Sequence, residues 1–267
     1  MIIIFDTYAG LCNQMYDILS GIKLMKEYHV HISFRYASFR RPNLVHFYPV
    51  PFQTLFSEEP FLKEPYFIPF SSIQGNLTRE NTFNWQGKRC IELWRRSHKV
   101  KPNEFLSILK KSKKKYILLK QFWSLELFPF ENKELIHWIK PNEKLYQSYQ
   151  NITEKLKIPN DYLFLHYRYE HDFIRFFQVN VPPLQDILNK IKKEKEPIYI
   201  ASTKIKELLE KEESNIYYKE ERKELNFEEN AMIDFLFGLY SKRVYGHSKS
   251  SFSHVLNDIK ETKNFYA

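Results

Sequence analysis

The sequence predicts an α/β protein with two doubly wound parallel sheets, and two observations support this fold class. Apolar runs of strand length alternate with amphipathic stretches of helix length near the N-terminus, and the same alternation returns in the C-terminal half. Such alternation is typical of a parallel sheet that carries helices on both faces. The chain has 267 residues, which is enough for two domains of about 130 residues each.

The N-terminal half opens with a strand, a turn, a helix and a second strand. Residues 2–5 form an apolar run, and residues 6–10 form a short loop. Apolar side chains then recur at helical spacing as far as about Tyr28, namely Leu11, Met15, Ile18, Leu19, Ile22 and Met25. Residues 29–34 are the second predicted strand. In a sheet of this kind, ligands bind beyond the carboxyl ends of the strands.

The middle of the chain has less periodicity. Residues 38–102 are rich in Pro, Phe, Arg and Asn, which predicts irregular structure with short helices. Further along, the pattern predicts a helix over residues 103–113, a strand over residues 115–120 and a helix over residues 148–157.

The C-terminal half repeats the alternation of strand and helix four times. Strands are expected at residues 162–167, 197–202, 215–218 and 243–246. Helices are expected at residues 183–193, 205–212, 228–240 and 250–259. We therefore predict two Rossmann-like domains facing across a cleft, with residues 1–157 in the first and residues 158–267 in the second.

Composition narrows the classes of function. The net charge of +9 favours anionic partners, which include nucleic acid, acidic lipid and the phosphates of a nucleotide. The lysine run at residues 110–115 is typical of a solvated helix end, and no nucleic-acid-binding motif accompanies it.

Two cysteines, Cys12 and Cys90, form neither a disulfide framework nor a zinc motif. No signal peptide and no apolar stretch of about 20 residues is found, so no membrane span and a cytoplasmic location are expected.

Three polar segments fall where the predicted sheets would bind a ligand. The first is residues 9–14, at the turn into the first helix. Backbone N–H groups at a helix start suit an anion, Gly10 permits close approach of a ligand, and Asn13 offers an amide that can donate to oxygen. An ordinary helix start capped by Asn13 would account for the same residues.

The second segment, residues 166–172, leaves the first strand of the C-terminal half. Arg168 presents a fixed fork of donors that fits a diphosphate and could stabilise its departure as a leaving group. The competing interpretation is a surface ion pair between Arg168 and Asp172.

The third segment, residues 250–253, opens the last helix, and its serine hydroxyls and N–H groups could cradle a phosphate. Ordinary capping by Ser250 is the alternative. Upstream, Asp234 lies in an apolar helical stretch and could accept the two adjacent N–H donors of guanine. A buried Asp with a structural partner explains Asp234 equally well.

In their order along the chain, these segments resemble the superfamily of GDP-fucose-dependent fucosyltransferases. This superfamily includes the protein O-fucosyltransferases, the plant O-fucosyltransferase-like proteins and the α1,2- and α1,6-fucosyltransferases. Residues 10–15 are similar to its N-terminal G-x-x-N-Q turn, and residues 166–172 are similar to its H-x-R-x-x-x-D segment. Asp234 and residues 250–253 resemble its third region, and residues 197–202 resemble the strand between.

The resemblance implies a GT-B fold and an inverting, metal-independent transfer of fucose from GDP-fucose to a glycan or protein hydroxyl. It implies that Arg168 binds the β-phosphate and assists its departure, and that Asn13 lies beside the diphosphate or the fucose. His166 and Asp234 would hold the guanosine. The remaining donor-binding residues implied are Gly10, Leu11 and Cys12 of the first turn and Ser250, Ser251 and Phe252 around the phosphates and ribose.

The general base stays open, with Asp6, Glu170 and Asp172 as candidates. No cofactor is expected, and the sequence has no Asp-x-Asp triplet of the kind that chelates a metal–diphosphate. Two other functions fit the same segments. One is a transferase of the same fold that uses another nucleotide sugar, and the other is an inactive protein that binds a nucleotide sugar or a glycan.

Overall fold

The computed structural model describes residues 1–41, 46–85, 102–120, 135–169, 173–175, 178–191, 196–203, 205–209, 214–220 and 222–267. The chain divides into two compact units, unit 1 (Met1–Asn142) and unit 2 (Glu143–Ala267). The boundary lies 15 residues before the one drawn from the sequence after residue 157, because helix α6 (Glu143–Leu156) belongs to unit 2.

Unit 1 is built on one five-stranded sheet with strands β1 (Ile2–Asp6), β2 (His31–Arg40), β3 (Phe47–Pro51), β4 (Thr82–Trp85) and β5 (Tyr116–Lys120). The strand order is β3-β2-β1-β5-β4, and every pair is parallel except β2 with β3. Its described helices are α1 (Leu11–Tyr28), α2 (Phe70–Ile73), α4 (Pro102–Lys110) and α5 (Leu135–Trp138), with 3₁₀ turns η1 (Phe52–Thr54), η2 (Glu59–Phe61) and η3 (Gln74–Asn76).

Strands β3 and β4 form the two edges of this sheet, and the prediction of irregular structure with short helices was wrong for both. Strand β3 contains Pro49 and Pro51, which cannot donate to a ladder and are therefore tolerated only at an edge or bulge. Strand β4 has only four residues, too few for a periodic signal.

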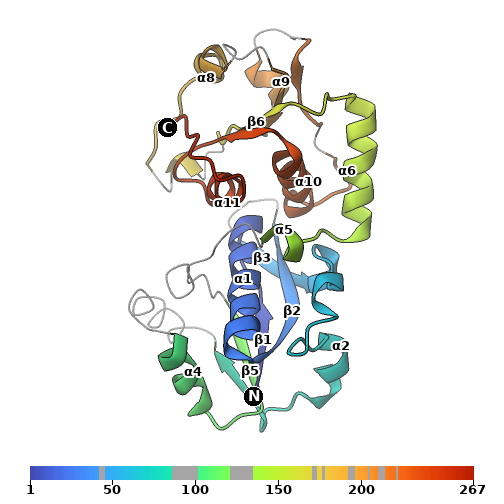
Figure 1. Cartoon of the computed structure of the whole chain (residues 1–267), viewed down its shortest axis with the longest axis vertical. Coiled ribbons are helices and arrows are strands. Elements are labelled where there is room, and N and C mark those ends of the chain that lie inside the picture. Colours follow the sequence, from blue (N-terminus) through green and yellow to red (C-terminus); the bar gives the residue numbers. More distant parts are fainter. Residues whose placement is uncertain are drawn as a thin grey trace. The chain divides into compact units, whose positions relative to one another are not determined.

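Helix α1 packs on one face of the sheet and is buried along most of its length. Gly21 lets it come close to β2, since a Cβ at that position would lie 3.1 Å from the ring of Phe34. The opposite face carries a second cluster, in which Ile4 packs with Ile73 of α2. Figure 1 shows α1 lying along the sheet strands. Both faces of the unit 1 sheet are therefore covered.

Unit 2 holds a four-stranded sheet, all of it parallel, with strands β6 (Leu163–His166), β7 (Ile198–Ala201), β8 (Ile216–Tyr217) and β9 (Arg243–Tyr245) in the order β8-β7-β6-β9. Its described helices besides α6 are α8 (Leu184–Ile191), α9 (Ile205–Leu208), α10 (Phe227–Tyr240) and α11 (Ser251–Ile259).

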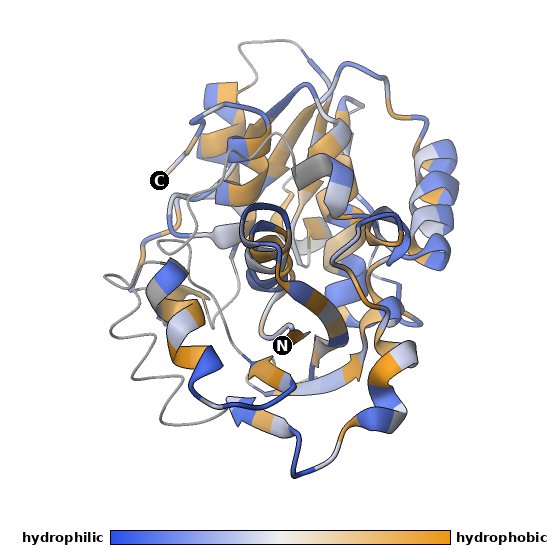
Figure 2. Ribbon diagram, turned by 60° about the horizontal axis from the view of Figure 1, so that its bottom comes forward, coloured by the Kyte–Doolittle hydropathy of each residue, from blue (hydrophilic) through white to orange (hydrophobic). Residues whose placement is uncertain are grey.

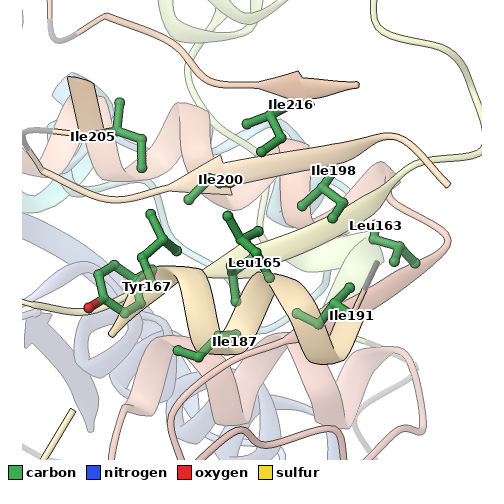
Figure 3. Packing of buried hydrophobic residues seen from close by; sticks show 11 residues of the cluster. Leu163, Leu165, Tyr167, Ile187, Ile191, Ile198, Ile200, Ile205 and Ile216 are labelled. Carbon is green, nitrogen blue, oxygen red and sulfur yellow. The ribbon is translucent and has the colours of Figure 1, made fainter. Parts of the chain in front are cut away.

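The alternation of side chains along β6 separates two cores. Leu163 and Leu165 face an aliphatic cluster that includes Ile187 of α8, and Figure 3 shows the side chains of α8 directed at the strands. Phe164 points to the other face, where its ring meets Tyr199 and Phe252. Helices thus cover both faces, as the sequence pattern predicts for a doubly wound sheet.

The predicted α/β fold class with parallel sheets is confirmed. Figure 2 colours the strands of unit 2 mostly hydrophobic and α6 mostly hydrophilic, in keeping with buried strands and a surface helix. Among the described residues, no helix is long and apolar enough to cross a membrane.

The aliphatic core of unit 2 can be tested with Leu165→Ala. Leu165 is fully buried, so truncation should lower the free energy of unfolding by about 2–5 kcal/mol, measured by urea denaturation. Leu62→Ala removes the same atoms from an exposed site and should change it by less than about 0.5 kcal/mol. Equal effects of the two substitutions would contradict this account of the core.

Candidate functional site

The turn after β1 is held by Gln14, which the sequence did not single out as a binding residue. The Gln14 side chain is fully buried and uses its amide completely. Its Oε1 accepts from the Thr7 hydroxyl (2.9 Å) and from Ser38 N–H (2.8 Å). Its Nε2 donates to the carbonyls of Ala9 (2.9 Å) and Ser38 (2.8 Å). These four bonds fix the turn to β2, so the second half of the Asn13-Gln14 pair has a structural role.

The N-cap residue of α1 provides no side-chain cap. Gly10 is the N-cap residue, it offers no side chain, and the first turn contains no acidic residue. Asn13 therefore does not cap the helix, and its side chain is half-exposed, whereas Leu11 and Cys12 are buried. The preceding residue, Ala9, has a φ of 76°, which costs free energy for a residue with a Cβ.

Asp6, one of the candidate bases, is bound by a neighbouring arginine. Arg35 donates from Nε to Asp6 Oδ1 (2.8 Å) and from Nη2 to Asp6 Oδ2 (2.5 Å). Both carboxylate oxygens thus belong to a bidentate, largely buried ion pair.

The segment that leaves β6 is held by Tyr266, near the end of the chain. The Tyr266 hydroxyl accepts from Arg168 N–H (3.2 Å) and donates to the His166 carbonyl (3.2 Å). The guanidinium carbon of Arg168 lies 4.5 Å from the centre of the Phe173 ring. Tyr266 lies 100 residues from His166 in sequence, so no local pattern could have indicated this contact.

Glu170 and Asp172 lie outside the described residues, as does His171. Their predicted roles, and the alternative ion pair of Asp172 with Arg168, stay predictions. Cys90 also lies outside the described residues.

His166 is a neutral histidine bound to the last helix. Its Nδ1 lies 2.9 Å from the hydroxyl of Ser253, and its ring centre lies 4.4 Å from that of Phe252. Burial, together with the nearby charge of Arg168, lowers the pKa of His166 to about 3. The Ser253 oxygen also accepts from His247 N–H (3.2 Å).

His247 is a buried histidine that the sequence analysis missed. Its Nδ1 accepts from Lys249 N–H (3.0 Å), which puts the proton of the neutral ring on Nε2. That Nε2 is buried and has no hydrogen-bond partner among the described residues. Burial lowers the pKa of His247, as do the charges of Lys249 and Arg168. A polar residue directly after the β9 strand was the available signal.

The start of α11 is also uncapped. Ser250 occupies the N-cap position, yet its hydroxyl makes no capping bond, is buried, and has no hydrogen-bond partner among the described residues. Ordinary capping by Ser250 is therefore not what the structure contains. By contrast, α10 is closed by a capping box between Asn226 and Glu229. The uncapped start of α11 retains N–H groups and a hydroxyl that an anion could satisfy.

Asp234 is paired within the protein, as the alternative interpretation of a buried Asp with a structural partner expected. Lys219 Nζ lies 2.9 Å from its Oδ2, and the Tyr199 hydroxyl donates to its Oδ1 (2.8 Å). Burial raises the pKa of Asp234, and the charge of Lys219 opposes the shift. Each oxygen keeps a further lone pair, so a base edge could share the carboxylate, but Asp234 is already paired without one.

The sheet of unit 2 brings several of the predicted residues together. Strands β6 and β9 are parallel neighbours, so Arg168 after β6 and the serine turn after β9 both follow the carboxyl end of the sheet. The bond between His166 and Ser253 joins the two segments directly. No group of three potential metal ligands occurs among the described residues.

Solved structures share this fold, although no family model and no curated protein matches the sequence. POFUT1 in complex with GDP-fucose gives a TM-score of 0.70 at 12% identity, covering 100% of this chain and 98% of that chain. POFUT1 in complex with GDP gives 0.68 at 13% identity over 100% and 98%. The fucosyltransferase NodZ from Bradyrhizobium gives 0.60 at 11% identity over 96% and 91%. This chain has the fold of these fucosyltransferases.

The role of Gln14 can be tested with Gln14→Leu, which keeps the size of the side chain and removes its four hydrogen bonds. Each buried group left unpaired costs about 1–3 kcal/mol, and several groups lose their partner. The free energy of unfolding, measured by urea denaturation, should therefore fall by more than about 3 kcal/mol. Gln74→Leu, at an exposed position, is the control and should change it by less than about 0.5 kcal/mol. A Gln14→Leu protein as stable as the control would refute the structural role.

The neutral state of His166 predicts a pH dependence. In the unfolded chain histidine takes up a proton below about pH 6.5, whereas His166 in the fold resists protonation down to about 3. The contribution of His166 to stability is therefore present above about pH 6.5 and is lost progressively as pH falls toward 3. In an NMR titration, with the signal assigned by its absence in His166→Asn, the ring should not titrate between pH 7.5 and 5. A midpoint near about 6.5 would contradict the assignment.

Proposed function

We propose that this protein is an inverting, metal-independent glycosyltransferase that moves fucose from GDP-fucose to a hydroxyl of a glycan or protein. The observation that carries the proposal is the carboxyl end of the unit 2 sheet, where the segment with Arg168 and the uncapped start of α11 follow two neighbouring parallel strands and are joined by the bond between His166 and Ser253. The fold shared with fucosyltransferase structures supports it, since two of those structures are complexes with GDP-fucose and GDP.

In this proposal the diphosphate binds at the start of α11. Backbone N–H groups of the first helical turn point at the anion, and the buried Ser250 hydroxyl gains a partner, which it lacks among the described residues. The Nε2–H of His247 is a further donor of the same kind. Because His247 and His166 are neutral, the positive charge that faces the phosphates comes from Arg168 and the helix start.

The reaction is one in-line displacement at the anomeric carbon. The acceptor oxygen forms a bond to that carbon while the bond to the β-phosphate oxygen breaks, so the configuration inverts. Negative charge grows on the departing GDP, and the guanidinium of Arg168 is suited to stabilise it. The acceptor hydroxyl gives its proton to a base, for which Glu170 and Asp172 remain the candidates, because Asp6 is bound by Arg35.

Asn13 is proposed to contact the donor or the acceptor through its amide. Its half-exposed side chain and its place in the first turn of α1 support a role in binding. Metal independence belongs to the proposal because Arg168 and the start of α11 supply positive charge of the kind that a metal ion would otherwise supply.

A second candidate function is a transferase that uses another nucleotide sugar. The expected preference for guanine rested on Asp234, and this carboxylate is already bound by Lys219 and Tyr199. The proposed phosphate site at Arg168 and the start of α11 does not depend on Asp234, so the same chemistry could act on a different nucleotide. Thermal-shift measurements with GDP, GDP-fucose, GDP-mannose and UDP-glucose separate the two candidates. A larger shift with UDP-glucose than with any guanosine nucleotide would favour the second.

The role of Arg168 can be tested by comparing Arg168→Ala with Arg175→Ala. Loss of the guanidinium removes charge-assisted hydrogen bonds to the leaving group, so transfer from GDP-fucose should slow by about a hundredfold or more while the fold persists. Arg175 is a nearby exposed arginine, and its loss should leave transfer unchanged. Turnover is measured as release of GDP, and folding by circular dichroism. Near-normal turnover in Arg168→Ala would overturn the assignment.

A further inference from the structure

Unit 2 contains a groove that takes no part in the site described above. It lies between α6 and the end of α10, helices that run beside each other in Figure 1, and has a volume of about 320 Å³. Its lining consists of Tyr146, Tyr149, Gln150, Thr153, Glu154 and Tyr240. Each of these side chains carries a hydrogen-bonding group, so the groove is polar as well as aromatic. Its volume falls at the lower end of the range for small-ligand sites.

Three tyrosine rings form the aromatic part of the groove. The rings of Tyr149 and Tyr240 are stacked, with centres 5.6 Å apart and planes at 25°. Tyr146 lies 6.2 Å from Tyr149. Tyr240 is 52% exposed, which makes it one of the few large rings that the described surface leaves open to solvent. An aromatic face kept in water in this way is typical of a binding surface.

The groove is rigid because its inner ring belongs to the core. Tyr149 is buried and packs edge-on against Phe237, with ring centres 4.8 Å apart. Phe237 in turn stacks on Tyr199 at 4.1 Å. Burial raises the pKa of Tyr149 to about 12 and also raises the pKa of Tyr240, so both hydroxyls stay neutral near pH 7. A preformed surface of this kind loses little conformational entropy when a ligand binds.

The charge of the lining selects the class of ligand. Glu154 brings a carboxylate and Gln150 an amide, and none of the six lining residues is cationic. An anionic ligand such as a nucleotide or a phosphate would meet repulsion there. A sugar ring fits better, because its C–H groups can lie on the negative face of an aromatic ring while its hydroxyls bond to the amide and the carboxylate.

We propose that this groove binds a neutral oligosaccharide. If the protein is the proposed transferase, the bound chain is the acceptor glycan, held at a position remote from the reacting hydroxyl. That role rests on the proposed function, whereas the binding of a saccharide does not.

The experiment measures saccharide binding without any nucleotide. Chitotetraose, cellotetraose and mannotetraose are titrated into the full-length protein, and binding is followed by saturation-transfer NMR. At least one should bind, and Tyr240→Ala should weaken its affinity by about fivefold to tenfold, as expected for loss of an aromatic contact. Gln150→Ala should weaken it as well. Tyr240 is half-exposed, so its truncation leaves the core intact.

The matched control is Tyr169→Ala. Tyr169 is 49% exposed, close to the value for Tyr240, but it follows Arg168 and lies outside the groove. Its loss should leave saccharide affinity unchanged. The proposal fails if none of the three saccharides binds, if Tyr169→Ala weakens binding while Tyr240→Ala does not, or if Tyr240→Ala instead abolishes a dimer seen by sedimentation. If the protein binds a saccharide but shows no thermal shift with GDP-fucose, the proposed function is contradicted and the assignment of the groove is still supported.

Discussion

The hydroxyl of Ser253 joins the three elements on which the candidate site depends. It accepts from His247 N–H after β9 and bonds to His166 Nδ1 at the end of β6, while Ser253 itself lies in the first turn of α11. Gly246 makes this possible, because a Cβ there would lie 2.1 Å from the Ser253 oxygen. The start of α11 can therefore pack closely against the end of β9 only if residue 246 has no side chain. The hydroxyl of residue 253 then supplies the hydrogen bonds that join the two.

In both units a buried polar side chain positions a helix start whose N-cap residue makes no side-chain capping bond. In unit 1 the buried group is Gln14, and in unit 2 it is Ser253. Helix α10 shows that the same chain can close a helix start fully, since Asn226 and Glu229 cap it from both sides. The contrast matters chemically at α11. Backbone N–H groups in the first turn of a helix without a side-chain cap can donate to a ligand, whereas those of a capped helix already donate to its own side chains.

The sequence predicted the fold wherever local pattern decides structure. Helix α1 and the buried strands follow from apolar periodicity, whereas β3 and β4 depend on pairing with neighbours that are distant in sequence. The site divides in the same way. Arg168 and Ser250 could be found because polar residues follow predicted strands, while Tyr266 meets its partners across about a hundred residues. The pairing of Asp234 with Lys219 likewise has no local signature, and only the open alternative of a structural partner anticipated it.

One face of the unit 2 sheet is mainly aromatic and the other mainly aliphatic. The aromatic face connects the groove beside α6 with the candidate site at the start of α11. From Tyr149 the rings continue through Phe237 and Tyr199 to Phe164, and from there to Phe252 beside His166. Aromatic rings have few rotamers and stack in defined geometries, so the groove and the site are connected through side chains with few alternative conformations. A saccharide bound at one end and a diphosphate bound at the other would thus be held at a constant separation, with no conformational signal required between them.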